Sequence, residues 1–396
     1  MVRYVLLIFL FAVSQFSTAQ RVLSREEAVN LASQNKAYTS PAQLALARQQ
    51  QLAKGASQVD NPELEYEIDP YDPTSLGILM PLRAPSVYRS RRTLQRERVR
   101  LSELLVRMNR NEISRLVQNT YNEMQFLNAR LYLLQQQDSL YQSVKTAAQR
   151  NFQAGQINKL EELFAVNEAN NVANELNQVT VEYTAQKRAM AFILNLTTDY
   201  VVDSLAPLRI DTLYTSLADT LPANLQQDIL RQQIAISRGE LQLERSELLP
   251  QVTAGPFIGL QSPHGEGEKR LGFRVNLSVP LWLGQNRARV RSAELGVQLA
   301  EAERARDIQN YRQEYQTALG QVIGRTRSVQ YYATTATSQA NEIITTALRL
   351  FRAGQLSYIE TLRNIITAYT TRVAYLETTR DYNQAVIQLN YLKGSF

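Results

Sequence analysis

The sequence predicts a mainly α-helical protein with a small β part, in which long antiparallel coiled-coil helical hairpins and two β-hairpins form a tandem duplication. The 396 residues include only 15 Gly and 12 Pro. Two tracts, at about 85–195 and 285–394, hold few of these and abound in helix formers, with apolar residues in steps of three and four. Two shorter segments, at 62–82 and 251–281, instead alternate apolar and polar residues, as strands do.

The duplication is visible around two glycines. The stretch RNFQAGQINKLEELF, from Arg150, matches RLFRAGQLSYIETLR, from Arg349, at seven of fifteen positions, and the two glycines lie 199 positions apart. The same offset carries Pro81 onto Pro280, so that 74 residues separate proline from glycine in both halves. Equal spacing without gaps indicates that one structural unit occurs twice.

The expected domain organisation follows from this offset. We expect a signal peptide at 1–19, a first repeat at 20–196 with a helix, a β-hairpin at 62–82 and a long helical hairpin at 90–196, a linker or equatorial region at 197–224, and a second repeat at 225–396 with a helix, a β-hairpin at 251–281 and a helical hairpin at 285–394.

The N-terminus is typical of a secretory signal peptide. Arg3 precedes an apolar run from Tyr4 to Val13, and small residues at Ser17 and Ala19 indicate cleavage after Ala19. The run is shorter than the roughly 18 residues of a membrane-spanning helix, so an N-terminal anchor is the weaker interpretation. No later segment has such a run, so we expect an exported protein that can cross a membrane only with strands.

Composition excludes several classes of site. The chain has no Cys and His264 is its only His, which rules out disulfides, a lipid anchor on Cys, and most His-based metal sites and catalytic triads. The formal charge of +6 is interspersed along the helical tracts, so no nucleic acid partner is indicated. The sequence contains no Gly-rich phosphate loop, and the adjacent Glu161 and Glu162 would point about 100° apart on a helix. We therefore expect no enzyme, no cofactor and no metal.

Each long helical tract carries an apolar stripe and contains a glycine at which the chain can turn. Ser24 followed by Glu27 is a capping box that starts the first helix. Apolar steps averaging about 3.5 residues indicate coiled-coil packing. Gly155 and Gly354 favour a reversal into a second helix, because glycine adopts the left-handed conformation cheaply; a helix running straight through is the alternative. The stripe comprises Ile113, Val117, Tyr121, Met124, Leu127, Leu131 and Leu134, and in the second repeat Ile308, Tyr311, Tyr315, Leu319, Val322 and Val329.

The alternating segments have one apolar and one polar side. Apolar residues from Leu271 to Val279 alternate with polar or small ones, over about the eleven residues that a tilted strand needs to cross a bilayer. If the apolar side meets lipid, the polar side lines a lumen; in a soluble sandwich the apolar side meets a core, and the pattern fits both. Four strands cannot close a barrel, so the lipid interpretation requires several copies. The polar side carries Glu65, Glu67, Asp69 and Arg274.

Several segments, in this order and spacing, resemble the TolC-like family of outer-membrane efflux ducts: LSREEAVNLA, NPELEYE, LLPQVTAGPFIGL, LSVPLWLGQNRARVRSAE and two F-x-AGQ turns. The resemblance covers nearly the whole mature chain. It implies a homotrimer whose twelve strands form one β-barrel in outer-membrane lipid, continued by a periplasmic tunnel of twelve helices. It also implies docking on a periplasmic adaptor protein and an inner-membrane pump. The segment PLWLGQNRARV is similar to that of ducts paired with heavy-metal-type resistance pumps. The expected pump is of the RND type.

The resemblance further implies roles for single residues. Glu360, with its first-repeat equivalent Glu161, corresponds to an acidic residue of the periplasmic gate. Arg363 stands where the family has a second acidic residue, and it can neutralise Glu360 through an i,i+3 pair. The adaptor-docking tip would consist of Ala154, Gly155, Gln156 and Ile157 with Ala353, Gly354, Gln355 and Leu356.

The leading functional hypothesis is a passive duct in the outer membrane, exported with a cleaved signal peptide and not lipidated, through which small molecules or cations leave the periplasm. The alternative is a soluble periplasmic helical-hairpin adaptor without its own channel, although such an adaptor would need further domains beside a single hairpin. Three carboxylates in a lumen would suit cations. With no Cys, one His and five Met, however, the chain offers no relay for soft metals, so drugs and other small amphiphiles remain equally open.

Overall fold

The computed structural model describes residues 21–68, 74–209, 224–259, 270–279 and 283–394. The chain divides into two compact units, one from residues 1–38, 111–221 and 314–396 and the other from 39–110 and 222–313. We call the first the helical unit and the second the sheet unit. Three helices have residues in both: α3 (Lys36–Gly55), α4 (Pro85–Gln153) and α7 (Leu283–Tyr331).

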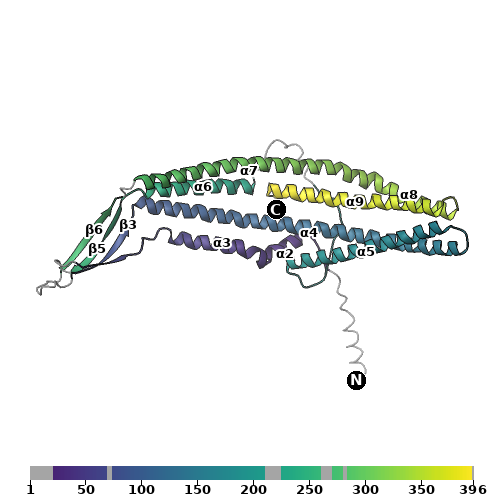
Figure 1. The fold of residues 1–396 in the computed structure, drawn as a ribbon, viewed down its shortest axis with the longest axis horizontal. Coiled ribbons are helices and arrows are strands. Elements are labelled where there is room, and N and C mark those ends of the chain that lie inside the picture. The colour runs from purple at the N-terminus through teal and green to yellow at the C-terminus, as the bar shows by residue number, and fades with distance from the viewer. Residues whose placement is uncertain (1–20, 69–73, 210–223, 260–269, 280–282, 395–396) are drawn as a thin grey trace, which may run out of the picture. The chain divides into compact units, whose positions relative to one another are not determined.

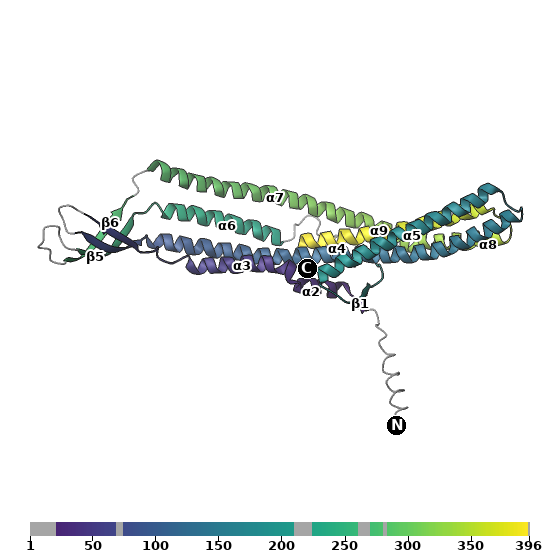
Figure 2. The ribbon, with the colours of Figure 1, turned by 60° about the horizontal axis from the view of Figure 1, so that its bottom comes forward.

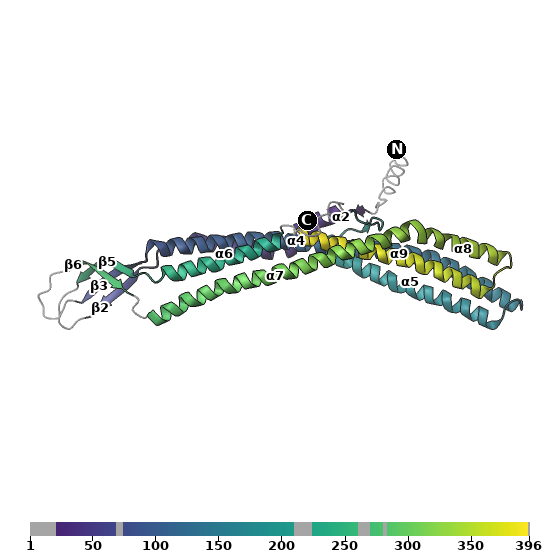
Figure 3. The ribbon, with the colours of Figure 1, turned by 90° about the horizontal axis from the view of Figure 1, so that it is seen from above.

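The sheet unit contains one four-stranded antiparallel sheet in the order β2, β3, β5, β6 (Figures 1 and 3). These strands are β2 (Glu63–Glu67), β3 (Ser75–Leu82), β5 (Gln251–Gly259) and β6 (Arg270–Ser278). Each repeat supplies one antiparallel pair, and β3 joins β5 in a register that sets Met80 opposite Ala254. The sequence does not predict this joining, in which one edge of each pair is satisfied by the other repeat while β2 and β6 remain the outer strands.

The two faces of this sheet differ in polarity, as the alternation predicts. We call the side that carries the apolar side chains the apolar face and the other side the polar face. Exposure of the apolar face is high and reaches 83% at Leu271. A continuous exposed apolar surface of this kind marks a contact with lipid or with a partner. The apolar face carries Leu64, Tyr66, Leu76, Ile78, Met80, Leu82, Leu271, Phe273, Val275 and Leu277.

Helix α6 (Leu225–Ser246) packs in the sheet unit beside α4 and α7. It begins at Asn224, whose side chain accepts a hydrogen bond of 2.9 Å from the backbone N–H of Gln227. Three surface ion pairs connect α6 to its neighbours, and although each contributes little free energy, they show which sides of α6 face α4 and α7. The pairs are Arg98–Glu240 with α4, and Arg238–Glu301 and Arg245–Glu294 with α7.

The N-terminal helix begins as the sequence predicts. Ser24 is the N-cap of α2 (Arg25–Gln34), and its hydroxyl accepts a hydrogen bond of 3.2 Å from the backbone N–H of Glu27. The helix α2 ends at Asn35, immediately before α3 starts. The Asn35 side chain donates to the carbonyl oxygen of Ile193 at 2.9 Å, at the end of α5 (Lys159–Leu194), which lies beside α2 in Figure 2. This hydrogen bond therefore connects the N-terminal segment to the first helical hairpin.

In the helical unit, α4 and α5 form the first hairpin, while α8 (Thr337–Arg352) and α9 (Tyr358–Lys393) belong to the second (Figures 1 and 3). The predicted stripe of α4 is buried, and Val117, Tyr121 and Met124 have no exposed surface. One core lies among α4, α5 and α9 and includes Leu134 and Leu362. The first hairpin and α9 thus share a core instead of packing separately.

The second hairpin is interrupted at one place. Residues Tyr332–Ala336 form a π-helical turn, η2, between α7 and α8, in which the backbone N–H of Thr337 donates to the carbonyl oxygen of Tyr332. The equivalent residues of the first repeat, 133–137, lie in the regular helix α4. A π-turn accommodates an extra residue, so α8 is rotated relative to α7. The equal spacing of the repeats does not predict this interruption.

A short parallel strand pair anchors the predicted linker. β1 (Arg21–Leu23) pairs with β4 (Tyr200–Val202). The hydroxyl oxygen of Tyr121 lies 2.6 Å from the carbonyl oxygen of Leu23 and 2.6 Å from Oδ1 of Asp203, which connects both strands to α4. Strands of three residues are too short to show an alternation, so the sequence does not predict them.

Candidate functional site

The two glycine turns have the same backbone geometry. Gly155 follows α4 and Gly354 follows α8, with φ angles of 70° and 72°. In both turns the backbone N–H of the residue after glycine donates to the carbonyl oxygen five residues earlier in the chain. This is the hydrogen bond of a Schellman motif at a helix end. The chain therefore reverses at both glycines, as expected, and does not continue straight through. The two bonds run from Gln156 N to the oxygen of Asn151 at 2.8 Å and from Gln355 N to the oxygen of Leu350 at 2.9 Å.

Most of the residues expected at the docking tip face solvent. Around both Gly155 and Gly354, a built Cβ meets nothing within 4 Å. Their neighbours Ala154, Gln156, Ala353 and Gln355 are exposed as well. Ile157 packs against the core of the helical unit, and its equivalent Leu356 is also half-buried. We call these eight residues, 154–157 and 353–356, the tip residues.

The two predicted gate glutamates close capping boxes. Glu161 accepts a hydrogen bond of 3.1 Å from the backbone N–H of Asn158, whose side chain caps Glu161 N at 2.9 Å. Glu360 accepts 3.0 Å and 2.9 Å hydrogen bonds from the backbone N–H and the hydroxyl of Ser357. Both carboxylates thus satisfy donors at the start of the helix that follows the turn. The sequence contains the signal for both caps, Asn or Ser three residues before Glu.

The charge of Glu360 is stabilised where it stands. Hydrogen bonds from the backbone N–H and the hydroxyl of Ser357, together with the charge of Arg363, hold the pKa of Glu360 below its ordinary value of 4.5. Its contribution to stability is therefore complete at neutral pH and is lost only as the pH falls through that lowered pKa. Near the turns, the described residues form the i,i+3 ion pair Lys159–Glu162 but not the expected pair of Glu360 with Arg363.

The two tips differ in the residue that directly follows each N-cap, Lys159 in the first and Tyr358 in the second. In the first, Lys159 lies over the ring of Phe152, 4.8 Å from its centroid. In the second, the equivalent Tyr358 is buried against Phe351 with the ring centroids 4.6 Å apart, and its hydroxyl accepts a 2.8 Å hydrogen bond from Asn151. Because Asn151 belongs to α4, this bond joins the two hairpins beside their turns. The sequence does not predict this role of Tyr358, because it depends on Asn151, a residue of the other repeat.

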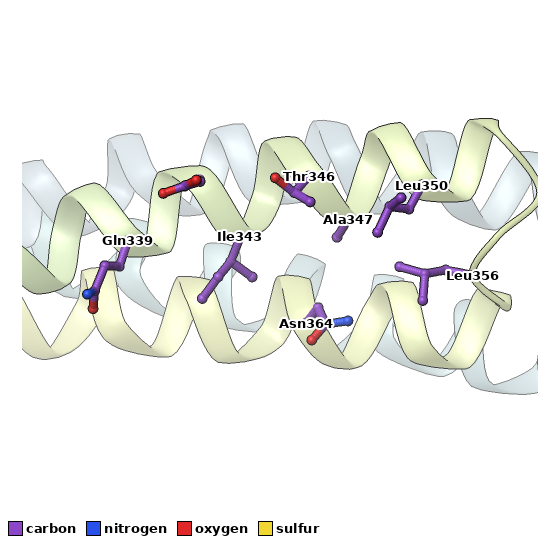
Figure 4. A pocket seen from close by; sticks show the side chains of 8 residues that line it. Gln339, Ile343, Thr346, Ala347, Leu350, Leu356 and Asn364 are labelled. Atoms are coloured by element: carbon purple, nitrogen blue, oxygen red, sulfur yellow. The ribbon is translucent and has the colours of Figure 1, made fainter.

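A groove of about 480 Å³ lies between α8 and α9 behind the second turn (Figure 4). Ile343, Ala347 and Leu350 of α8 point across it toward Leu356 and Asn364 in Figure 4. Ile343 is 39% exposed, so the apolar lining is open to solvent. The groove gives the second tip a concave apolar surface next to the exposed residues of the turn.

On the polar face of the sheet, one arginine bridges two glutamates. Arg274 of β6 pairs with Glu65 and, at 2.7 Å, with Glu67, both on β2. β2 and β6 are the two outer strands, which a flat sheet would hold about 14 Å apart, at about 4.8 Å per strand spacing. The three long side chains therefore span the width of the sheet on its polar face. The guanidinium lies 5.1 Å from the ring centroid of Phe257, and a Cβ on Gly272 would be 2.5 Å from that ring.

This bridge connects three of the four residues expected on the polar side. Arg274 is shared by Glu65 and Glu67, so these three side chains form a mixed cluster with one net negative charge per chain. Asp69, the third expected carboxylate, lies outside the described residues, as do His264, Trp282 and the expected signal peptide. Pairing across three strand spacings cannot be deduced from an alternating pattern.

Neither a metal site nor a helical membrane span emerges from the described residues. No three His, Asp or Glu side chains of the described part lie close enough together to hold a metal ion. None of the helices, as far as the structure describes them, has a stretch both long and apolar enough to span a bilayer.

Comparison with known proteins shows what the second repeat and the whole fold are similar to. Residues 223–395 match the family model of the outer membrane efflux proteins. No curated protein matches the sequence. Among solved structures, the fold is similar to the outer membrane protein VceC from Vibrio cholerae, at 15% identity and a TM-score of 0.76, over 93% of this chain and 96% of that one. It is also similar to a membrane protein from Pseudomonas aeruginosa, at 14% identity and a TM-score of 0.78 over 93% of both chains.

A third similar structure is the CmeC outer membrane channel of Campylobacter jejuni, at 15% identity and a TM-score of 0.75, over 94% of this chain and 86% of that one. The predicted resemblance to the TolC-like outer membrane efflux family is thereby confirmed, by the family model over the second repeat and by the fold over nearly the whole chain. Proteins of this family are efflux channels and not enzymes.

Proposed function

We propose that this chain is the outer-membrane channel of a tripartite efflux system, a passive duct for small molecules or cations. The observation that supports this most is the sheet, with its exposed apolar face and its charged cluster on the polar face. A soluble hairpin adaptor, the alternative, would have to keep that apolar face in water, where it promotes aggregation. A lipid-facing sheet needs no such protection.

In this proposal the channel is a homotrimer. β2 and β6 are the outer strands of the sheet, and lipid does not tolerate unpaired strand edges. If β6 of one copy pairs with β2 of the next, three copies supply twelve strands and close a β-barrel without a free edge. The apolar face would then meet outer-membrane lipid, and the polar face would line the lumen with Glu65, Glu67, Asp69 and Arg274.

The tip residues would dock on a periplasmic adaptor protein, which connects the duct to an inner-membrane pump of the RND type. Support comes from the exposure of both turns and from the hydrogen bond between Asn151 and Tyr358, which holds the two hairpins together beside them. The apolar groove behind the second turn offers a complementary surface for an apolar side chain of such an adaptor.

The charged cluster on the polar face bears on the class of cargo. A cluster in which one arginine serves two glutamates attracts cations only weakly, so neutral and zwitterionic molecules would pass as well. Small amphiphiles and simple cations are thus the cargo classes that fit this surface.

The proposal is tested first by location and assembly. The mature protein, beginning after Ala19, should fractionate with the outer membrane and run as a heat-sensitive trimer on unheated gels. A soluble monomer in the periplasmic fraction would refute the channel and favour the adaptor alternative.

Replacing both Gly155 and Gly354 with Asp should reduce efflux at least about tenfold while the trimer persists. Asp tolerates positive φ, and a Cβ at these positions meets no neighbour, so the turns should keep their shape while the docking surface gains charge. Efflux is measured as drug susceptibility and dye export in cells that lack other ducts.

The matched control for this prediction is the double variant with Asn at both glycines, which has the same shape and the same tolerance of positive φ but no charge. It should keep most of the efflux. Wild-type efflux in the Asp variant would contradict a docking role for the tips.

The capping and gate roles of Glu360 can be separated by two substitutions. Gln can occupy the same place in a capping box, so Glu360→Gln should keep amide hydrogen exchange of residues 357–361 slow, whereas Glu360→Ala should accelerate it. If the carboxylate charge also forms the gate, with Glu161 and Arg363, both variants should raise the conductance of the reconstituted protein or weaken its block by cations. Unchanged conductance in both variants would remove Glu360 from the gate and leave it as a helix cap.

A further inference from the structure

A cavity of about 680 Å³ lies in the helical unit, at a distance in sequence from both turns. Four segments of one chain build its wall: the middle of α4, the residues that follow β4, the start of α8 and the middle of α9. Cavities of roughly 300–1,000 Å³ are the usual size of small-molecule sites. No residue assigned above to the tips, the gate or the polar face of the sheet lines this cavity.

The cavity carries a single charge. Arg372 of α9 is the only charged residue of its lining. The Nε and Nη2 groups of Arg372 donate to Oδ1 of Asn341, the former at 2.9 Å, and the guanidinium lies 5.3 Å from the ring centroid of Tyr369. No carboxylate of the described residues pairs with it. A guanidinium has five N–H donors, so Arg372 keeps donors for a further acceptor.

The π-turn η2 brings polar groups into the same wall. Thr337 and Asn341 are the first and fifth residues of α8, directly after the turn, and both line the cavity. The hydroxyl of Thr337 is buried and has no hydrogen-bond partner within the described part of the chain. Buried polar groups without a partner are uncommon and call for a physical explanation. π-turns occur often at functional sites, and the first repeat has none at the equivalent place.

The remaining lining is neutral and largely apolar. Leu131, Leu205 and Leu376 supply aliphatic surface, and Tyr375 adds an aromatic ring. An occupant that satisfies this wall needs one acceptor group with negative charge for Arg372, and a compact apolar body for the leucines. An inorganic anion would leave most of the cavity empty. A neutral apolar molecule would leave the guanidinium of Arg372 without a negatively charged hydrogen-bond acceptor.

We propose that this cavity is a binding site for a small amphiphilic anion, with its carboxylate held by Arg372 and its apolar body against Leu131, Leu205 and Leu376. Asn341 orients the guanidinium by fixing two of its N–H groups, and η2 holds Asn341 and Thr337 at the wall. The site does not depend on the proposed channel function, because binding can be measured without transport.

The probe for the experiment is 1-naphthoate, a rigid carboxylate that is soluble in water and forms no micelles. The full mature chain in lipid nanodiscs is dialysed to equilibrium against labelled 1-naphthoate, with empty nanodiscs as the blank. We expect saturable binding of one molecule per chain. The neutral analogue 1-naphthamide should bind at least about tenfold more weakly, since hydrogen bonds to a charged group are the stronger ones.

Two variants and a matched control locate the site. Arg372→Gln should weaken 1-naphthoate binding at least about tenfold, and Arg372→Lys should retain part of it. Arg352→Gln removes the same charge from an exposed residue at the end of α8 and should bind like the wild type. The oligomeric state of each variant is recorded on unheated gels.

Absence of saturable binding to the wild type, or equal binding of acid and amide, would overturn the proposal. Wild-type affinity in Arg372→Gln would do the same. If Arg372→Gln loses its oligomeric state while the wild type binds no 1-naphthoate, the cavity instead receives a carboxylate from a second copy of the chain, and the small-molecule site is refuted.

Discussion

Gly255→Ala is expected to remove nearly all assembled protein from the outer membrane. A Cβ at this position would stand 1.9 Å from the carbonyl oxygen of Ile78, 2.9 Å from its carbonyl carbon and 3.1 Å from the Cα of Leu79. All three are backbone atoms of β3, so no side-chain rotation relieves the overlap. β3 and β5 would have to separate, and their pairing is what joins the strands of the two repeats into one sheet.

The measurement is the amount of heat-sensitive oligomer in the outer-membrane fraction, which should fall at least about tenfold, as expected for a severe steric defect in a core element. Gly284→Ala is the matched control, because a Cβ there meets nothing within 4 Å and alanine favours the helix α7. Normal assembly of Gly255→Ala would mean that β3 and β5 do not approach each other this closely.

Asn383→Leu is expected to destabilise the helical unit by about 2–3 kcal/mol, at the upper end of the usual range for point mutations, because it breaks a hydrogen-bond network that reaches into the core. Asn383 of α9 has no exposed surface. Its Oδ1 accepts from the backbone N–H of Leu208 at 2.8 Å, and its Nδ2 donates to the carbonyl oxygen of Ala206 and to Oδ1 of Asn122, both at 2.9 Å. Leucine would remove all three bonds and leave Oδ1 of the fully buried Asn122 without this donor, at about 1–3 kcal/mol for that group before relaxation.

The check is the midpoint of thermal loss of the helical circular dichroism signal, compared with that of Asn364→Leu. Asn364 is an exposed residue of the same helix whose side chain donates only to the carbonyl oxygen of Glu360, so this control should unfold within about 0.5 kcal/mol of the wild type. Adding Asn122→Leu to Asn383→Leu should restore part of the loss, because one of the unpaired groups is then removed. Equal midpoints for the two single variants would show that the buried network contributes nothing.

Much of this fold could be predicted from local patterns. The steps of three and four located the long helices, and their apolar residues, such as Val117 and Met124, are fully buried. The repeated AGQ located both reversals, because only a residue that adopts positive φ cheaply ends a helix in this way. The strict alternation near Leu271 assigned an apolar and a polar face to the strand without any knowledge of its pairing partners.

The candidate site could be predicted only in part. The tip residues followed from the duplication, but the carboxylates of Glu161 and Glu360 proved to be engaged by their own N-caps. Arg274 was expected on the polar side, yet its bridge to Glu67 depends on the pairing of β3 with β5, which puts β2 and β6 in one sheet. Tyr358 and Asn151 meet only because the two hairpins lie together.

The sequence alone determined the elements of this protein: two repeats, their long helices, their glycine turns and the polarity of each strand. These depend on periods of two and of about 3.5 residues and on the conformational freedom of glycine, all of which act within a few residues. Only the tertiary structure decided that the four strands form one sheet, that η2 interrupts a single repeat and that Arg372 faces a cavity without an acidic partner among the described residues. These features arise from contacts between residues far apart in the chain, which a local pattern does not encode.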